Sequence, residues 1–272
     1  SSAASDVYKR QSLPFLSRKK AEFGVGIARM EDRYFQTNII DFSETKHDES
    51  TYSIFGGSIV LEGSTLNARQ FATQGSREKM AAQIFTGTEH FRSGISKVTK
   101  GTPEPYKKVQ SWLQVSYQNE TYHKVSPKFT LGAYLEAYYS SRNFSNNYTA
   151  TLMQAGEFTP TAHSKVTYNE AFRANQYAGV GTMPIYQLSE SFQLRGEFYG
   201  FIPIFPIKKD EYGQAYYGKA FTKFEYLGEI SLVFQLSFGS ISAYVNHYSS
   251  PSNDWNVGLT LGWQLFNSRF VE

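Results

Sequence analysis

The sequence predicts an all-β protein, an antiparallel transmembrane β-barrel with about twelve strands in this chain. Three observations predict this fold: a two-faced strand close to the C-terminus, a high aromatic content, and long alternating segments separated by turns. Side chains on a strand alternate with period two, so one face can contact lipid while the other contacts water.

The clearest two-faced segment is the last one, residues 255–266. Its odd positions are large and apolar, and its even positions are small or polar until Phe266. The odd positions are Trp255, Val257, Leu259, Leu261, Trp263 and Leu265. A strand of this kind near the end of the chain is typical of a barrel that closes with its final strand.

Composition supports a membrane barrel over a soluble sandwich. Aromatic residues make up 17% of the 272 residues and charged residues only 19%, as expected where rings form girdles at the membrane interfaces. No apolar run approaches the ~20 residues that a membrane helix needs, so a helical membrane protein is excluded. A net charge of +3 does not indicate nucleic-acid binding, and the absence of cysteine excludes disulfides and thiolate metal sites.

The first eleven residues are predicted not to be native. The segment SSAASDVYKRQ, residues 1–11, resembles the translation of a sequencing-library adapter and is set aside as a scar. The native chain is then expected to begin at about Ser12 inside a truncated gene, so that residues 12–272 form a barrel domain whose N-terminal strands are missing.

Alternating segments recur along the chain at lengths suited to the ~9–11 residues that cross a bilayer at a tilt. The predicted strands are 21–30, 33–42, 52–65, 79–91, 109–120, 128–139, 147–156, 174–187, 191–203, 222–238, 240–249 and 255–266. In 222–238 the charged residues Glu225 and Glu229 share the face that is expected to line a wet lumen. Arg195 and Glu197 do the same in 191–203.

The connections fall into two length classes. Residues 187–191 and 238–240 are tight turns, whereas residues 155–172 and 203–220 are long and rich in Pro, Tyr and Lys. Short turns on the periplasmic side and long loops outside are the usual pattern of bacterial outer-membrane barrels.

The last strand also carries a short motif. Asn256, Gly258, Leu261 and Trp263 resemble the β-signal, a polar-x-Gly-x-x-hydrophobic-x-aromatic pattern that the barrel-insertion machinery recognises. Glycine permits close backbone approach at an edge strand, and the two apolar side chains point outward. A half-buried edge strand of a soluble protein is the alternative.

Residues 152–272 resemble the C-terminal barrel of patatin-like phospholipases of Gram-negative bacteria. The resemblance is carried by LMQAGEFTPTAHSK, FRANQYAG, FYGFIPIFPI and the final run from YLGEISLVFQLSFG to the C-terminus. It implies a location in the outer membrane, with a patatin hydrolase and a POTRA-type domain upstream in the same chain. It also implies a barrel of about sixteen strands, so we expect an open seam next to the Ser12 end.

In that barrel superfamily a loop bearing an Arg folds into the lumen. Phe172, Arg173 and Ala174 stand at the corresponding place, with Ala174 where Gly is usual, and five predicted strands follow. Because an Arg in a lumen needs a carboxylate partner, we expect Arg173 to pair with Glu197, or with Glu225 or Glu229 as second choices. An exposed loop arginine is the alternative.

No catalytic, metal or cofactor site is predicted. The Gly-x-Ser-x-Gly and Asp-Gly motifs of patatin enzymes are missing, so the Ser-Asp dyad of the parent enzyme is expected upstream. The five histidines, His47, His90, His123, His163 and His247, show no ligand spacing. Glu225 and Glu229 lie about 13 Å apart on one strand, beyond the range of paired carboxylate catalysis.

The sequence thus predicts a non-catalytic outer-membrane anchor or translocator of a lipid hydrolase. Its expected partners are outer-membrane lipid, the insertion machinery and the upstream domains. A free-standing porin or channel is the alternative. A soluble barrel or sandwich is a third reading, which requires Leu232, Phe234 and Leu259 to be covered by protein.

Overall fold

The computed structural model describes residues 2–14, 19–34, 47–94, 106–166, 168–236, 239–250 and 255–263. Eleven strands form one antiparallel sheet in which each strand pairs with the next along the chain. They are β1 (Ser2–Pro14), β2 (Lys19–Tyr34), β3 (Asp48–Ser64), β4 (Gly75–Arg92), β5 (Tyr106–Lys124), β6 (Phe129–Ser140), β9 (Gln176–Gln187), β10 (Phe192–Pro203), β13 (Glu225–Leu236), β14 (Gly239–Tyr248) and β15 (Trp255–Trp263). The all-β antiparallel meander expected from the alternating segments is therefore confirmed.

Two hairpins and three short helical segments lie within the long connections. The hairpins pair β7 (Gly156–Glu157) with β8 (Arg173–Ala174) and β11 (Ile207–Lys209) with β12 (Ala215–Tyr217). The helical segments are α1 (Tyr148–Gln154), η1 (Ser164–Val166) and η2 (Glu170–Phe172). None of the helices in the described part of the chain is long and apolar enough to cross a membrane.

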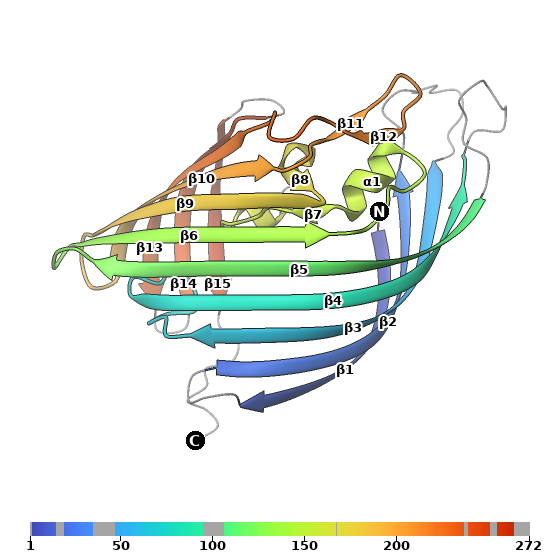
Figure 1. The fold of residues 1–272 in the computed structure, drawn as a ribbon. Coiled ribbons are helices and arrows are strands. Elements are labelled where there is room, and N and C mark those ends of the chain that lie inside the picture. The colour runs from blue at the N-terminus through green and yellow to red at the C-terminus, as the bar shows by residue number, and fades with distance from the viewer. Residues whose placement is uncertain are drawn as a thin grey trace.

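The sheet is strongly curved and open (Figure 1). Its edge strands are β1 and β15, which are not paired with each other in the described residues. The strands β13 to β15 curve behind the front strands, and α1, β7 and β8 lie on the concave side between the two (Figure 1). The described sheet therefore does not close into a barrel, and its seam is next to the N-terminal strand, where an open seam was expected.

The predicted strand 147–156 is wrong. The chain forms helix α1 there, because the Asn147 side chain caps it by accepting a hydrogen bond from the amide of Ala150 at 2.8 Å. The helix is tied to β2: Asn147 Nδ2 donates to Tyr34 Oη at 2.9 Å, and Gln154 Nε2 donates to Asp32 Oδ2 at 2.8 Å. The prediction failed because the apolar residues in this ten-residue segment fit both a strand and a helix that is buried on one side.

The N-terminal part of the chain also differs from the expectation. Residues 21–30 and the start of 33–42 belong to one strand, β2, while residues 35–42 lie outside the described residues. Ser2–Pro14 forms β1, which pairs with β2 along its whole length and so satisfies the backbone groups at that edge. The adapter origin of residues 1–11 stays a prediction, because backbone pairing does not depend on where a sequence came from.

The two ends of the sheet differ in their connections. At one end the described residues are joined by short turns such as 125–128 and 188–191, while the other end carries the long connections 141–175 and 204–224. We call these the short-turn end and the long-loop end. The strands β2 to β5 contain 16, 17, 18 and 19 residues, compared with 12 in β6, β9, β10 and β13, so they are longer than a bilayer crossing requires.

The buried apolar cluster lies on the concave face. Phe158 and Phe172, from the long connection before β9, pack against Tyr177, Tyr199 and Phe201 on the inner faces of β9 and β10. Phe158 and Phe201 have a centroid separation of 5.5 Å and an interplanar angle of 27°. The inserted connection therefore supplies the core that an open sheet cannot build by itself.

Candidate functional site

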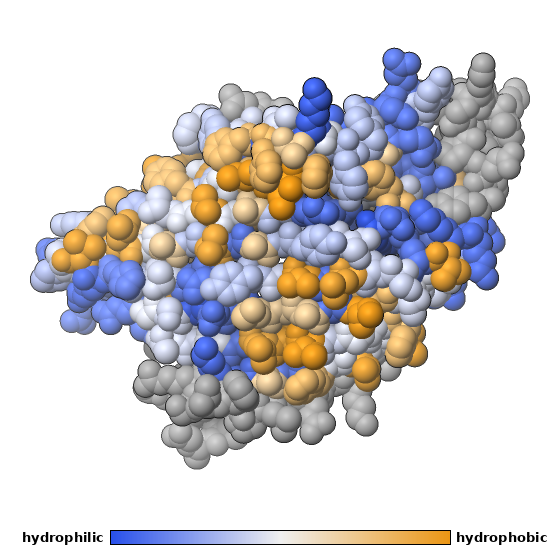
Figure 2. Space-filling view, viewed as in Figure 1, coloured by the Kyte–Doolittle hydropathy of each residue, from blue (hydrophilic) through white to orange (hydrophobic). Residues whose placement is uncertain are grey.

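Large apolar side chains are exposed on the convex face of the sheet, while several charged side chains are buried on its concave face. On β10 the charged Arg195 is 2% exposed and faces the concave side, while Leu194 and Phe198 are 42% and 48% exposed on the convex side. On β13 Glu229 and Ser231 are buried, whereas Ile230 and Leu232 are exposed. Apolar residues form patches in the middle of the visible face, and hydrophilic residues gather toward both of its ends (Figure 2). Such a face would be unfavourable against water but favourable against lipid.

Arg195 is the centre of the concave polar network. Its Nε donates to Glu197 Oε1 at 3.1 Å, and its Nη1 donates to the Ala72 carbonyl at 2.9 Å and to Gln193 Oε1 at 3.3 Å. Its Nη2 donates to Tyr122 Oη at 3.4 Å. These hydrogen bonds replace the water that the guanidinium loses on burial. The network therefore holds β10, β5 and the segment that contains Ala72 together.

The segment 65–74 enters the concave side from the short-turn end. Besides the Arg195 bond to Ala72, the Phe71 carbonyl accepts from Gln235 Nε2 at 3.3 Å, and Gln70 Oε1 accepts from Ser240 Oγ at 3.0 Å. Within the segment, the Asn67 carboxamide accepts from the amides of Thr73 and Gln74, both at 3.0 Å. Phe71 takes a φ of 53°, a left-handed conformation that a non-glycine residue adopts only where contacts impose it.

His163 holds the second inserted segment from the long-loop end. Its Nδ1 lies 2.6 Å from Glu229 Oε1, and its ring stacks on Tyr244 with a centroid separation of 3.6 Å. Its Nε2 lies 3.5 Å from Ser242 Oγ. This order of groups imitates a Ser-His-Glu triad, but all three side chains are at most 4% exposed, so no substrate can approach Ser242. We interpret the three residues as an anchor for residues 155–172.

The expected Arg173–Glu197 pair is replaced by two other pairs. Arg173 Nη2 lies 2.8 Å from Glu157 Oε2 across the β7–β8 hairpin, and its guanidinium lies 4.6 Å from the centroid of the Tyr168 ring. Glu197 is taken by Arg195, which is on the same strand and two residues away. Arg173 therefore stabilises the connection to which it belongs, whereas Glu197 pairs with Arg195 of the same strand, β10.

The other predicted lumen carboxylates are also paired on the concave side. Glu225 lies 3.3 Å from Lys223 Nζ and accepts a short hydrogen bond from Ser249 Oγ. Glu229 is held by His163, as described above, and by Asn246 Nδ2 at 3.5 Å. Of the predicted lumen residues, Arg195, Glu197, Glu225 and Glu229 are buried, and Arg173 is partly buried.

The β-signal residues lie on the edge strand β15. Leu259 and Leu261 are 82% and 67% exposed on the convex side, and Asn256 faces the other way. A Cβ at Gly258 would lie 2.6 Å from the Tyr244 hydroxyl, so the glycine permits that ring to cross the edge strand. The backbone of Trp263 pairs with Gly239, while residues 264–266 of the predicted strand lie outside the described residues.

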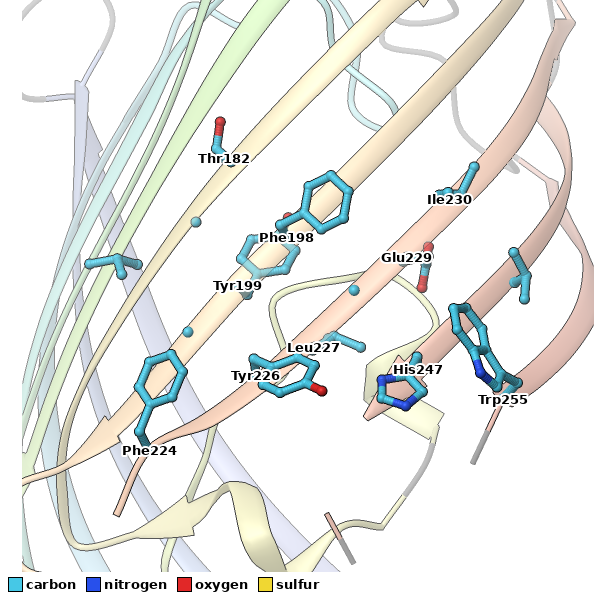
Figure 3. A pocket seen from close by; sticks show the side chains of 15 residues that line it. Thr182, Phe198, Tyr199, Phe224, Tyr226, Leu227, Glu229, Ile230, His247 and Trp255 are labelled. Carbon is cyan, nitrogen blue, oxygen red and sulfur yellow. The ribbon is translucent and has the colours of Figure 1, made fainter. Parts of the chain in front are cut away.

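An aromatic row crosses the convex face near the long-loop end. Tyr226, His247 and Trp255, from β13, β14 and β15, lie side by side, with Phe224 continuing the row (Figure 3). Ring centroids are 5.8 Å apart for Tyr226 and His247 and 4.8 Å apart for His247 and Trp255. Rows of neighbouring aromatic side chains also occur in the interfacial girdles of outer-membrane barrels.

Comparisons with known proteins leave the family open. No protein-family model matches this chain, and no curated protein matches it.

Sequence reasoning missed the hub that Arg195 forms and the two anchors of the inserted segments. Residues two positions apart on a strand lie on the same face. This spacing could have predicted the pairing of Arg195 with Glu197. The partners Ala72 and Tyr122 are more than 70 residues away in sequence, and no local pattern indicates contacts at that separation.

Proposed function

We propose that this chain forms a β-barrel wall of a Gram-negative outer membrane protein and acts as a membrane anchor without catalytic activity. One observation carries the proposal: large apolar side chains are exposed on the convex face while Arg195, Glu197 and Glu229 are buried on the concave face. This arrangement is favourable in lipid, because the apolar side chains are then removed from water while the buried charged side chains keep their hydrogen-bond and ion-pair partners.

The thickness of the apolar zone supports the proposal. On β2 the outward residues Phe23, Val25 and Ile27 are apolar, and Arg29 follows toward the long-loop end while Lys19 precedes toward the short-turn end. The ten residue steps between the two cations span about 33 Å along the strand, or about 25 Å along the normal at a tilt of ~40°. A height of about 25 Å is that of the apolar band in outer-membrane barrels.

The filling of the concave face favours an anchor or translocator over an open pore. Segments 65–74 and 155–172 occupy the concave side of β9 to β14, where their contacts with Arg195 and His163 hold them. By its resemblance, the protein that this wall anchors is a patatin-like lipid hydrolase with its catalytic dyad upstream. The upstream genomic sequence tests this part: a patatin and a POTRA-type domain support it, and a signal peptide directly before the barrel contradicts it.

A channel is the second candidate function, and one observation favours it. The concave side of β2 to β5 has a hollow of about 540 Å³ lined by Lys20, Glu22, Glu62, Lys79 and several small residues. Planar-bilayer recordings of the purified protein separate the two candidates. An anchor gives no steady conductance, whereas a channel gives a stable conductance that changes when Lys79 is replaced by Glu.

A further inference from the structure

The long strands β2 to β5 extend past the apolar zone at the long-loop end, and their outward side chains there are charged. The register of β2 with β3 gives three successive rows of outward side chains. They are Arg29 beside Ser53, Glu31 beside Thr51, and Arg33 beside Glu49. The next strand continues these rows with His90 beside Thr51 and Arg92 beside Glu49. The first charged row therefore begins two residues, about 7 Å along the strand, beyond the apolar pair Ile27 and Phe55.

This charged surface is hollowed. A cavity of about 590 Å³ is lined by Arg29, Glu49, Thr51, Ser53, His90, Phe91, Arg92 and Lys107. Three of these residues are permanent cations and one is a carboxylate, so the lining carries a net charge of about +2 with His90 neutral. The hydrophilic residues at the right-hand ends of these strands are seen in Figure 2.

The three cations that line this hollow are in no ion pair with a described residue. None of the described carboxylates lies within ion-pair distance of Arg29, Arg92 or Lys107. At the short-turn end of the same strands Lys19 is paired with Glu78 at 3.4 Å, whereas Lys79 and Lys124 have no ion pair among the described residues. Three cations without a carboxylate partner among the described residues thus share one hollow where the proposed lipid contact ends.

We propose that Arg29, Arg92 and Lys107 bind the phosphate group of an anionic membrane lipid. The inference rests on the proposed function, because only an inserted barrel brings this hollow to the level of the headgroups. Guanidinium groups match phosphate oxygens in geometry, and Thr51 and Ser53 add hydroxyl donors in the same hollow. The acyl chains of that lipid then lie along the exposed side chains of Ile27, Phe55 and Ile84.

The test compares lipid binding by three forms of the refolded full chain in phosphatidylcholine nanodiscs containing phosphatidylglycerol. These are the wild type, the triple variant Arg29→Gln/Arg92→Gln/Lys107→Gln, and the control triple variant Arg69→Gln/Lys124→Gln/Lys128→Gln. The control removes the same charge from exposed cations at the short-turn end. Native mass spectrometry counts each lipid that stays on the protein.

We expect the wild type and the control to retain phosphatidylglycerol over phosphatidylcholine. The test variant should lose this preference by at least about tenfold, since each cation near an anionic surface contributes roughly fivefold. An equal preference in all three proteins, or an equal loss in both variants, would overturn the inference. Protection of the strands from protease in the nanodisc is measured in parallel, so failure to insert would instead contradict the proposed function.

Discussion

Arg195 and Glu197 lie two residues apart on the concave face of β10, with Arg195 Nε 3.1 Å from Glu197 Oε1. Both side chains are buried, and the same guanidinium reaches the backbone of segment 65–74 through Ala72. The pair therefore links the wall of the sheet to an inserted segment that comes from the opposite half of the chain.

Removing the guanidinium should destabilise the fold strongly. We expect Arg195→Met to lower the free energy of unfolding by about 3–5 kcal/mol, because Glu197 is then left as a buried charge without its partner. Urea unfolding of the protein in lipid vesicles, followed by tryptophan fluorescence, measures the change. The exposed Lys124→Met is the control, and an equal small effect of both substitutions would show that the network contributes little.

The double variant Arg195→Met/Glu197→Gln refines this prediction. It should be more stable than Arg195→Met alone, because the unpaired buried charge has been removed. Additive losses from the two single variants would contradict the coupling between the residues.

Phe158 should hold the connection 155–172 on the concave face. We expect Phe158→Ala to cost about 3–5 kcal/mol if the cavity does not collapse, and to speed trypsin cleavage after Lys165, which lies in that connection. The matched control is Phe224→Ala, since Phe224 is 61% exposed on the convex face. Unchanged cleavage at Lys165 in Phe158→Ala would mean that other contacts, such as His163 with Glu229, suffice to hold the segment.

The cost of placing a charge on the apolar convex face should depend on where along the strand it is placed. We expect Leu232→Arg to cost about 2–4 kcal/mol, the range for an arginine at the middle of a lipid-facing band, which is where the proposed function places Leu232. Leu188→Arg should change the stability by less than about 0.5 kcal/mol, because Leu188 lies in the turn between β9 and β10. The two leucines are 39% and 47% exposed, so a soluble protein would tolerate both substitutions equally.

The proposed β-signal predicts an effect on assembly rather than on stability. Leu261→Ala should slow insertion by the bacterial machinery several-fold while leaving unassisted refolding into short-chain lipid vesicles unchanged. Leu259→Ala is the control, because Leu259 is exposed on the same face but is outside the motif. Equal insertion rates for both variants would argue against recognition of Leu261.

Much of the strand arrangement could be predicted from the sequence because alternation with period two is a local property. Segments such as 191–203 and 222–238 have one charged and one apolar face, and the structure places β10 and β13 there with the charged faces buried. The same rule failed at 147–156, where a buried helix has apolar residues at spacings that also fit a strand. Strand β1 was not predicted, because residues 1–11 had been set aside as an adapter scar.

The concave network was harder to predict, because its partners are distant in sequence. Arg173 was expected to cross the concave face to Glu197, but Glu157 lies directly opposite it in the β7–β8 hairpin. The β7–β8 pairing places Glu157 beside Arg173, whereas Glu197 is already paired with Arg195 on its own strand. The side on which each charge lies was predictable from the sequence, and its partner was not.

Lipid contact along β13 tests the central claim most directly. The chain has no cysteine, so single substitutions Ile230→Cys, Ser231→Cys, Leu232→Cys and Val233→Cys can each carry a fluorophore. We predict that nitroxide-labelled acyl chains quench the probes at 230 and 232 strongly and those at 231 and 233 weakly. Equal quenching at all four positions, or strong quenching of 230 and 232 by a water-soluble quencher alone, would contradict the account.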